Sequence, residues 1–132
     1  MLLSRETDYA LRILQNLLEG ERKSVGEISK EELIPQQFAY KIIKKLSNAG
    51  LLDITRGVEG GCKLIADLGA VSLYDLMSVT DGVCEVNNCS APGYQCERRN
   101  RKGGCLTHSR LMAIQQRLDE ELRSYSLKSL LN

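Results

Sequence analysis

The sequence predicts a mainly α-helical chain that also carries one small β-hairpin, a cysteine-rich loop and a long C-terminal helix. Three observations support this fold class. Apolar residues recur at helical spacing through residues 10–46, and two short β-prone runs joined by glycines follow them. Four of the five cysteines then gather with the only histidine between residues 84 and 108.

Composition and charge exclude several function classes. The 132 residues suit one domain or a small domain with an arm, and a net charge of +1 means that any binding surface must come from locally placed charge. No apolar run approaches a membrane span or a signal peptide, so we expect a cytoplasmic protein with no membrane partner. Clustered cysteines there more often bind metal than form disulfides. With no phosphate-binding glycine loop and no evident catalytic partner for the histidine, we expect no enzyme.

Two helices are predicted before residue 33. The first ends near Gly20, and its apolar face holds Ala10, Ile13, Leu14, Leu17 and Leu18. Ser24 with Glu27 three residues later is a capping box, which opens a short second helix to about residue 31. A turn follows, because Pro35 disfavours helix at the residue before it and suits the start of the next helix.

A third helix is predicted over residues 36–48, with Gly50 as its stop. One face is apolar and holds Phe38, Ala39, Ile42, Ile43 and Leu46; the other holds Gln37, Tyr40, Lys41 and Lys44. Amide, phenol and ammonium groups are able to reach base edges and phosphates in a major groove. A solvated surface would carry the same residues. However, a short helix, a tight turn and a polar-faced helix together make the helix-turn-helix arrangement.

A β-hairpin is predicted directly after this helix, with strands over residues 51–55 and 62–66. The connecting residues include three glycines, which supply the positive-φ positions of a turn. An ordinary surface hairpin is the alternative, but this position in the chain favours the wing of a winged helix-turn-helix domain. We expect Gln36, Gln37, Tyr40 and Lys41 to face bases and Lys44, Arg56 and Lys63 to lie nearer phosphates, with Gly57 in the wing turn.

Further helices are predicted over residues 72–80, over 106–124 and, as a final turn, over 126–131. The long helix carries a narrow apolar line of Leu111, Ile114, Leu118, Leu122 and Tyr125. Such a line is typical of a helix-to-helix seam, so we expect it to pack on the same helix of a second subunit; packing on its own domain is the alternative. We therefore divide the chain into a DNA-binding domain (1–80), a cysteine loop (81–108) and a dimerisation helix with a tail (109–132).

The stretch from Cys84 to His108 has too few apolar residues to bury a core by itself. Thiolates and an imidazole on a loop are the donors that a soft metal or an iron–sulfur cluster requires. If the long helix begins near Cys105, then Cys105 and His108 share one face and can converge on one centre. A structural zinc site with three cysteines and a histidine uses the same donors.

Several motifs follow one another in a characteristic order: Asp8-Tyr9-Ala10-Leu11-Arg12, Ile34-Pro35, Ala49-Gly50-Leu51, Arg56-Gly57 with Gly60-Gly61, and Cys105-Leu106-Thr107-His108. In this order they resemble the Rrf2 family of winged-helix regulators, whose cluster-sensing members include IscR, NsrR and RirA. The resemblance covers nearly the whole chain.

The resemblance implies a homodimeric transcription factor, such as a repressor, on double-stranded promoter DNA. Its binding would respond to iron or cluster status, redox state or nitric oxide through an iron–sulfur cluster, with 2Fe-2S favoured over 4Fe-4S. The implied ligands are Cys89, Cys96 and Cys105. The fourth is His108 if the chain is IscR-like, or Asp8 of the other subunit if it is NsrR-like.

The chain departs from the family pattern in three places. The ligand spacing, Cys-x6-Cys-x8-Cys, is longer than the usual gaps, and Cys62 replaces an aromatic residue after the wing glycines. Cys84 is an additional thiol, and it is a spare ligand, a redox partner or an inert buried residue. Two alternative functions remain: a zinc-stapled or cluster-free regulator that responds to a protein or metabolite, and an iron–sulfur redox protein that does not bind DNA.

Overall fold

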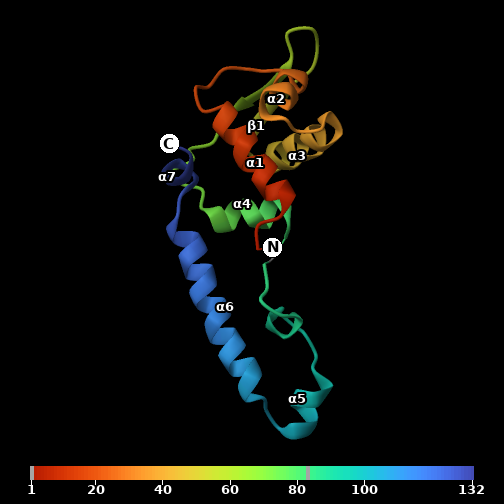
Figure 1. Ribbon diagram of the computed structural model, residues 1–132, viewed down its shortest axis with the longest axis vertical. Coiled ribbons are helices and arrows are strands. Elements are labelled where there is room, and N and C mark those ends of the chain that lie inside the picture. Colours follow the sequence, from red (N-terminus) through yellow and green to blue (C-terminus); the bar gives the residue numbers. More distant parts are fainter. Residues whose placement is uncertain (1, 83) are drawn as a thin grey trace.

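The computed structural model describes residues 2–82 and 84–132 and shows an elongated molecule, with a winged helix-turn-helix unit at one end and a long helix leading away from it (Figure 1). The helices are α1 (Arg5–Asn16), α2 (Val25–Glu32), α3 (Gln36–Asn48), α4 (Leu73–Thr80), α5 (Glu97–Lys102), α6 (Leu106–Ser124) and α7 (Leu127–Leu131), with a 3₁₀ turn η1 (Asn88–Ser90). The antiparallel strands β1 (Leu52–Thr55) and β2 (Gly61–Leu64) form the hairpin. The predicted fold class is confirmed. Within the two described ranges, no helix is long and apolar enough to cross a membrane.

One apolar core joins the three N-terminal helices to the hairpin. Its members that are at most 2% exposed include Ile13, Leu14, Ile28, Ile42, Leu46 and Leu52. Burying an aliphatic side chain of this size contributes about 1.5 to 3 kcal/mol, so this core is the main source of stability. Leu76 of α4 and Leu127 of α7 belong to the same core.

The start and stop signals of α2 and α3 act as predicted. The Ser24 hydroxyl accepts a hydrogen bond from the Glu27 amide at 3.1 Å, and α3 begins directly after Pro35. The turn between the two helices places Leu33 in the left-handed region, at φ 56°. We predicted that Phe38 would be buried with the apolar face of α3, and this prediction is wrong. The Phe38 side chain is 41% exposed, because it lies at the rim of the core beside the Tyr9 ring.

The hairpin is fastened to the segment before α2. Lys23 and Cys62 exchange two backbone hydrogen bonds, at 3.0 and 2.8 Å, and Arg22 donates to the Asp53 carboxylate and to the Gly61 carbonyl. A Cβ atom on Gly61 would lie 2.2 Å from the Lys23 carbonyl oxygen, so only glycine allows this approach. Cys62 is fully buried, and burial raises the pKa of its thiol to about 11. This cysteine therefore fills the core.

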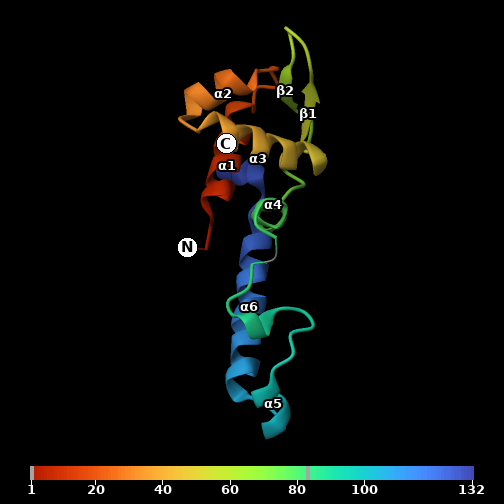
Figure 2. The ribbon, with the colours of Figure 1, turned by 90° about the vertical axis from the view of Figure 1, so that its right-hand side faces the viewer.

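The C-terminal tail folds back onto the winged-helix unit. The Leu127 amide donates to the Val71 carbonyl at 2.8 Å, the Lys128 amide donates to the Leu68 carbonyl at 3.0 Å, and Leu127 is fully buried. Figures 1 and 2 both place α7 beside α1. The long helix α6 is therefore anchored to the same body at its C-terminal end.

The apolar line of α6 is divided between two faces. Leu122 is 7% exposed and Gln115 is 6% exposed, and together with the half-buried Leu111 and Leu118 they face their own chain. Ile114 is 52% exposed and points away from this strip. The expectation that the whole line contacts a second subunit is therefore wrong for Leu122, because this side chain is already buried within its own chain.

Candidate metal centre and nucleic-acid interface

A groove of about 900 Å³ lies between α3 and the hairpin. Tyr40, Lys41 and Lys44 reach it from the helix, and Arg56 and Gly57 reach it from the wing turn. Tyr40 is 57% exposed, and the three cationic side chains are also exposed. The structure therefore brings together a phenol and three cations on one concave surface, which is a shape and charge suited to a polyanion.

Three other residues predicted to contact DNA lie outside the lining of this groove. Gln36 and Gln37 are exposed on the first turn of α3, and Lys63 is exposed on β2 opposite Asp53 in the strand register. The sequence pattern predicted that these three side chains would be exposed. It did not predict where they lie relative to the groove, because that depends on how the hairpin packs against α3.

Two lysines of α3 are held by a carboxylate of α1. Glu6 accepts hydrogen bonds from Lys41 Nζ at 2.5 Å and from Lys45 Nζ at 2.6 Å. These hydrogen bonds, that from Lys41 first, hold the pKa of the Glu6 carboxyl below its ordinary value. Sequence analysis missed Glu6, because contacts between distant helices leave no local pattern. The consequence is that Lys41, which we expected to face bases, is paired within its own chain.

A polar junction joins α1, α3 and the end of α4. Thr7 is fully buried, lies 2.6 Å from the Thr80 hydroxyl and donates to the Asp81 carboxylate at 2.6 Å. Ser4 donates to the other Asp81 oxygen, and Lys45 donates to the Thr80 carbonyl at 2.8 Å. Asp81 is the first residue of the predicted cysteine loop, so this junction connects the beginning of the loop to α3.

The predicted cysteine and histidine ligands line one cavity of about 240 Å³ beside α6. Its walls include Cys89, Cys96, Cys105 and His108. Asp8, the alternative fourth ligand, is not brought to this cavity within the chain, because it lies on α1 and forms an ion pair with Arg12 at 2.8 Å.

Cys84 lies outside the lining of this cavity and is half-buried. Burial raises the pKa of its thiol, and the carboxylates of Asp119, Asp81 and Glu85 raise it further. A thiol of this kind is a poor source of thiolate, and the three roles that we considered for Cys84 stay predictions.

Two of the cavity thiols cap helices. Cys96 Sγ accepts from the Arg99 amide at 3.5 Å at the start of α5, and Cys105 Sγ accepts from the His108 amide at 3.4 Å at the start of α6. The hydrogen bond from His108 is the largest of the effects that lower the pKa of the Cys105 thiol; the Arg98 guanidinium adds to them. A lowered pKa increases the thiolate fraction of Cys105 at a given pH. The sequence did not reveal α5, because its residues 97–102 contain no apolar periodicity.

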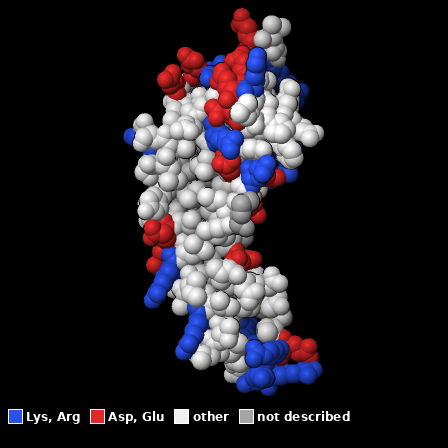
Figure 3. Space-filling view, in the orientation of Figure 1, with Lys and Arg blue, Asp and Glu red and all other residues white. Residues whose placement is uncertain are grey.

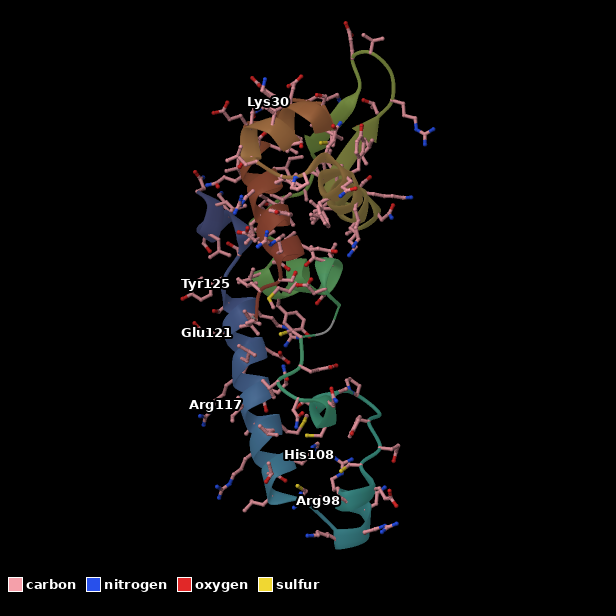
Figure 4. All side chains as sticks on the ribbon, turned by 45° about the vertical axis from the view of Figure 1, so that its right-hand side comes forward. Lys30, Arg98, His108, Arg117, Glu121 and Tyr125 are labelled. Carbon is pink, nitrogen blue, oxygen red and sulfur yellow. The ribbon has the colours of Figure 1, made fainter. Side chains whose placement is uncertain are left out.

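His108 is held by an arginine. Arg99 Nη1 lies 2.7 Å from His108 Nε2, whereas Nδ1 of the same ring is buried and has no hydrogen-bond partner among the described residues. In Figure 4, His108 on α6 and Arg98 on α5 lie at the same end of the molecule. In Figure 3 this end, far from the winged-helix unit, carries a cluster of Lys and Arg side chains, formed by Arg98, Arg101 and Lys102.

The donor set of this cavity fits a centre bound by thiolates and imidazole. Three thiols and an imidazole share one space, and such donors suit zinc or an iron–sulfur cluster. In the part of the chain that the structure describes, no three Cys, His, Asp or Glu side chains lie close enough together to hold a metal ion. Ligation would therefore require these side chains to come closer together.

Gln115 fastens the segment that leads to the first of these cysteines. Its side-chain oxygen accepts from the Val86 amide at 2.7 Å, and its nitrogen donates to the Cys84 carbonyl at 2.8 Å. Sequence analysis missed this residue, although a glutamine between Leu111 and Leu118 on the inner face of α6 was a detectable signal. A buried polar side chain must find partners, and here it finds the backbone of the loop.

Comparison with known proteins identifies the family of this chain. A family model named Rrf2 and described as an iron-dependent transcriptional regulator matches residues 3–132. Protein aau3 of Rhizobium meliloti (strain 1021) is 32% identical over 95 residues, which cover 70% of this chain but 62% of that protein, less than two thirds of its length. The transcriptional regulator IscR of Vibrio vulnificus (strain YJ016) is 26% identical over 135 residues, covering 100% of this chain and 78% of that protein.

Two solved structures share the fold. CymR (YrzC), the global cysteine regulator of B. subtilis, superposes with a TM-score of 0.72 at 23% identity, covering 98% of this chain and 95% of CymR. IscR of T. potens superposes with a TM-score of 0.71 at 20% identity, covering 98% and 85%. At these identities the likeness shows the fold alone.

Proposed function

The chain belongs to the Rrf2 family of transcriptional regulators, which are not enzymes, and from this premise we propose that it binds double-stranded promoter DNA as a homodimer under the control of a metal centre in its cysteine loop. One observation carries the proposal. The same chain places a cationic groove between α3 and the hairpin and a cavity lined by three thiols and an imidazole along α6.

In the proposed complex α3 enters a major groove and the hairpin lies along the flanking backbone. Tyr40, exposed on α3, is able to reach base edges, whereas Lys44 and Arg56 border the groove where phosphates would pass. Replacing Tyr40 with alanine should change the preferred DNA sequence. Lys44→Met should weaken all sequences alike and reduce the salt slope by about one per protomer. Equal effects of both substitutions on every sequence would argue against this division.

The exposed side of α6 supports the proposed dimer. Leu106 is 68% exposed and Ile114 is 52% exposed, so large apolar side chains remain outside the strip of α6 that faces its own chain. A two-fold axis through this face would bury the same residues from both copies. The two recognition helices would then read half-sites about one helical turn apart.

For the metal centre we propose an iron–sulfur cluster, 2Fe-2S in preference to 4Fe-4S, held by Cys89, Cys96, Cys105 and His108. When bound, such a cluster supplies one-electron redox chemistry and sensitivity to oxidants and nitric oxide. The chain supplies backbone amides that already point at the sulfurs of Cys96 and Cys105. Hydrogen bonds to sulfur and a neutral imidazole in place of a fourth thiolate both favour a raised reduction potential.

The polar junction supports a connection between the loop and the DNA surface. Bringing the donors together would move part of the loop, and the loop begins at Asp81, which is bound by Ser4 and Thr7 of the N-terminal region. Lys45 of α3 is bound to the adjacent Thr80 carbonyl. A shift of the loop would therefore change the restraints on α3.

The test uses full-length protein purified without oxygen. Iron, acid-labile sulfide, visible absorbance and Mössbauer spectra are compared for the wild type and for Cys89→Ser, Cys96→Ser and Cys105→Ser, with Cys84→Ser as the matched control. We expect loss of iron and colour from each of the three variants and retention in the control. Unchanged iron content when all three cysteines are replaced would refute the proposed ligands.

The same samples separate the alternatives. Stoichiometric zinc in a colourless protein would support a structural zinc site, because the donor set serves either metal. Absence of sequence-selective DNA binding, both with and without metal, would favour a redox protein.

A further inference from the structure

The one histidine of the chain has a partner that no sequence motif indicated. Arg99 Nη1 and His108 Nε2 are 2.7 Å apart, and this contact lies inside the cavity that Cys89, Cys96 and Cys105 line. An arginine among candidate metal ligands is unexpected, because its positive charge opposes a cation. The arrangement therefore has a chemical consequence for the fourth ligand.

The consequence follows from the donors and acceptors of the two side chains. A guanidinium has five N–H donors and no acceptor, so Nε2 must be the acceptor in this hydrogen bond. The neutral imidazole then carries its proton on Nδ1, which is the nitrogen without a partner among the described residues. Its single lone pair is occupied by Arg99.

A metal ion needs that same lone pair. Binding through Nε2 displaces the guanidinium directly. Binding through Nδ1 moves the proton to Nε2, which would then place an N–H group against the N–H group of Arg99. In either case the hydrogen bond between Arg99 and His108 and the ligation of a metal by His108 exclude one another.

The local fold holds Arg99 in this place. Its backbone amide donates to Cys96 Sγ, and its carbonyl accepts from the Gly104 amide at 3.0 Å, so both ends of the residue are fixed between two candidate ligands. Its Nη2 also donates to the Tyr94 carbonyl. Arg101, on the same helix, has a different environment from Arg99: its side chain is exposed and donates to Glu97.

We propose that Arg99 competes with the metal centre for His108, so that His108 becomes a ligand only after Arg99 withdraws from the cavity. This inference rests on the proposed function for its metal, but the occupied lone pair can be tested without any metal. Three thiolates would bind first, and exchange of Arg99 for the metal at His108 would be the last step of assembly. Arg99 thus acts as a specificity-determining residue that makes the fourth ligand conditional.

The first test is the tautomer of His108 in metal-free, full-length protein. Long-range proton–nitrogen correlation spectra at a pH well above about 6.5, the ordinary histidine pKa, report one imidazole, because the chain has one histidine. We expect Nε2 unprotonated in the wild type and in Arg101→Met, and a return toward the Nε2–H form in Arg99→Met. A protonated Nε2 in the wild type would overturn the proposal.

The second test is a cycle of variants titrated with Co²⁺, whose visible spectrum reports both thiolate and imidazole ligation. Arg99→Met should tighten Co²⁺ binding by about tenfold or more when His108 is present, the equivalent of one charge-assisted hydrogen bond. In a His108→Ala background, Arg99→Met should have only the smaller effect of removing a charge, as Arg101→Met does. Equal effects of Arg99→Met in both backgrounds, or weaker binding, would overturn the competition.

The two tests also separate this inference from the proposed function. If the protein proves to lack an iron–sulfur cluster, the tautomer and the Co²⁺ cycle still decide whether Arg99 occupies the lone pair of His108. If the cluster is present but the tautomer is Nε2–H, the proposed function stands and the role of Arg99 is refuted.

Discussion

Glu6 allows a direct test of the proposed DNA surface. Replacing it changes which lysines of α3 are free to bind DNA, while the sequence of α3 stays unchanged. The structure pairs its carboxylate with Lys41 and Lys45. Lys41 Nζ has no second partner among residues 2–82 and 84–132, while Lys45 also donates to the Thr80 carbonyl. Glu6→Gln should therefore release Lys41 toward the groove and leave Lys45 held.

The magnitude follows from the exposure of the pair. The Lys41 side chain is 55% exposed and that of Glu6 is 24% exposed, and an ion pair in such a setting is worth about 0.5 to 1 kcal/mol. A dimer that no longer has to break two such pairs should bind non-specific DNA about 5- to 30-fold more tightly. If each released lysine contacts one phosphate, the slope of log affinity against log salt should steepen by about 1.8.

The assay is fluorescence anisotropy on random-sequence duplex DNA over a range of salt concentrations. Glu120→Gln is the matched control, since it makes the same change of charge on α6, where Glu120 is exposed and bonded to Gln116. If Glu6→Gln and Glu120→Gln shift affinity and salt slope equally, then Glu6 acts only through net charge, and the reasoning from the pair is refuted.

Four further outcomes are expected. In metal-free protein, iodoacetamide followed by mass spectrometry should label Cys105 first, because its thiol pKa is lowered, and should label Cys84 and the buried Cys62, whose thiol pKa values are raised, much later. Ile114→Glu should weaken the dimer by at least about 100-fold in sedimentation, because two copies of an apolar contact worth about 1.5 to 3 kcal/mol are lost together; an unchanged dimer would place the seam elsewhere. Gln115→Leu should speed hydrogen exchange at the Val86 amide, since that amide loses its acceptor, the Gln115 side-chain oxygen, while exchange in α3 should not change. The carboxylate of Glu6 has a lowered pKa in the folded state, so its contribution to stability is present above about pH 4.3 and is lost as pH falls through the folded pKa; denaturation curves of Glu6→Gln should lack this loss.

Local sequence signals sufficed for most of the secondary structure. The hydroxyl of Ser24 and the ring of Pro35 mark helix starts by their own chemistry, and the structure begins α2 and α3 where they predict. The wing glycines predicted a turn, and the reason for Gly61 became visible only when the segment of Lys23 was placed against it. Capping and turn preferences act over a few residues, which is why a single sequence reveals them.

Contacts between distant segments were beyond the reach of local patterns. Three contacts depend on how whole helices pack together. They are the ion pair of Glu6 with α3, the hydrogen bonds of Gln115 to the loop backbone and the hydrogen bond of Arg99 to His108. The sequence identified the four donors of the cavity by residue type, and the structure adds the arginine that occupies one of them.

We propose that a metal centre bound by the cysteine loop controls the affinity for DNA, and one measurement tests this most directly. DNA selected from a random-sequence pool is titrated with the same anaerobic protein before and after its iron is removed, and after reconstitution. We expect the dissociation constant to change by about 5- to 150-fold on removal, the usual size of a coupling free energy, and to return on reconstitution. Identical affinities in all three states would contradict the account.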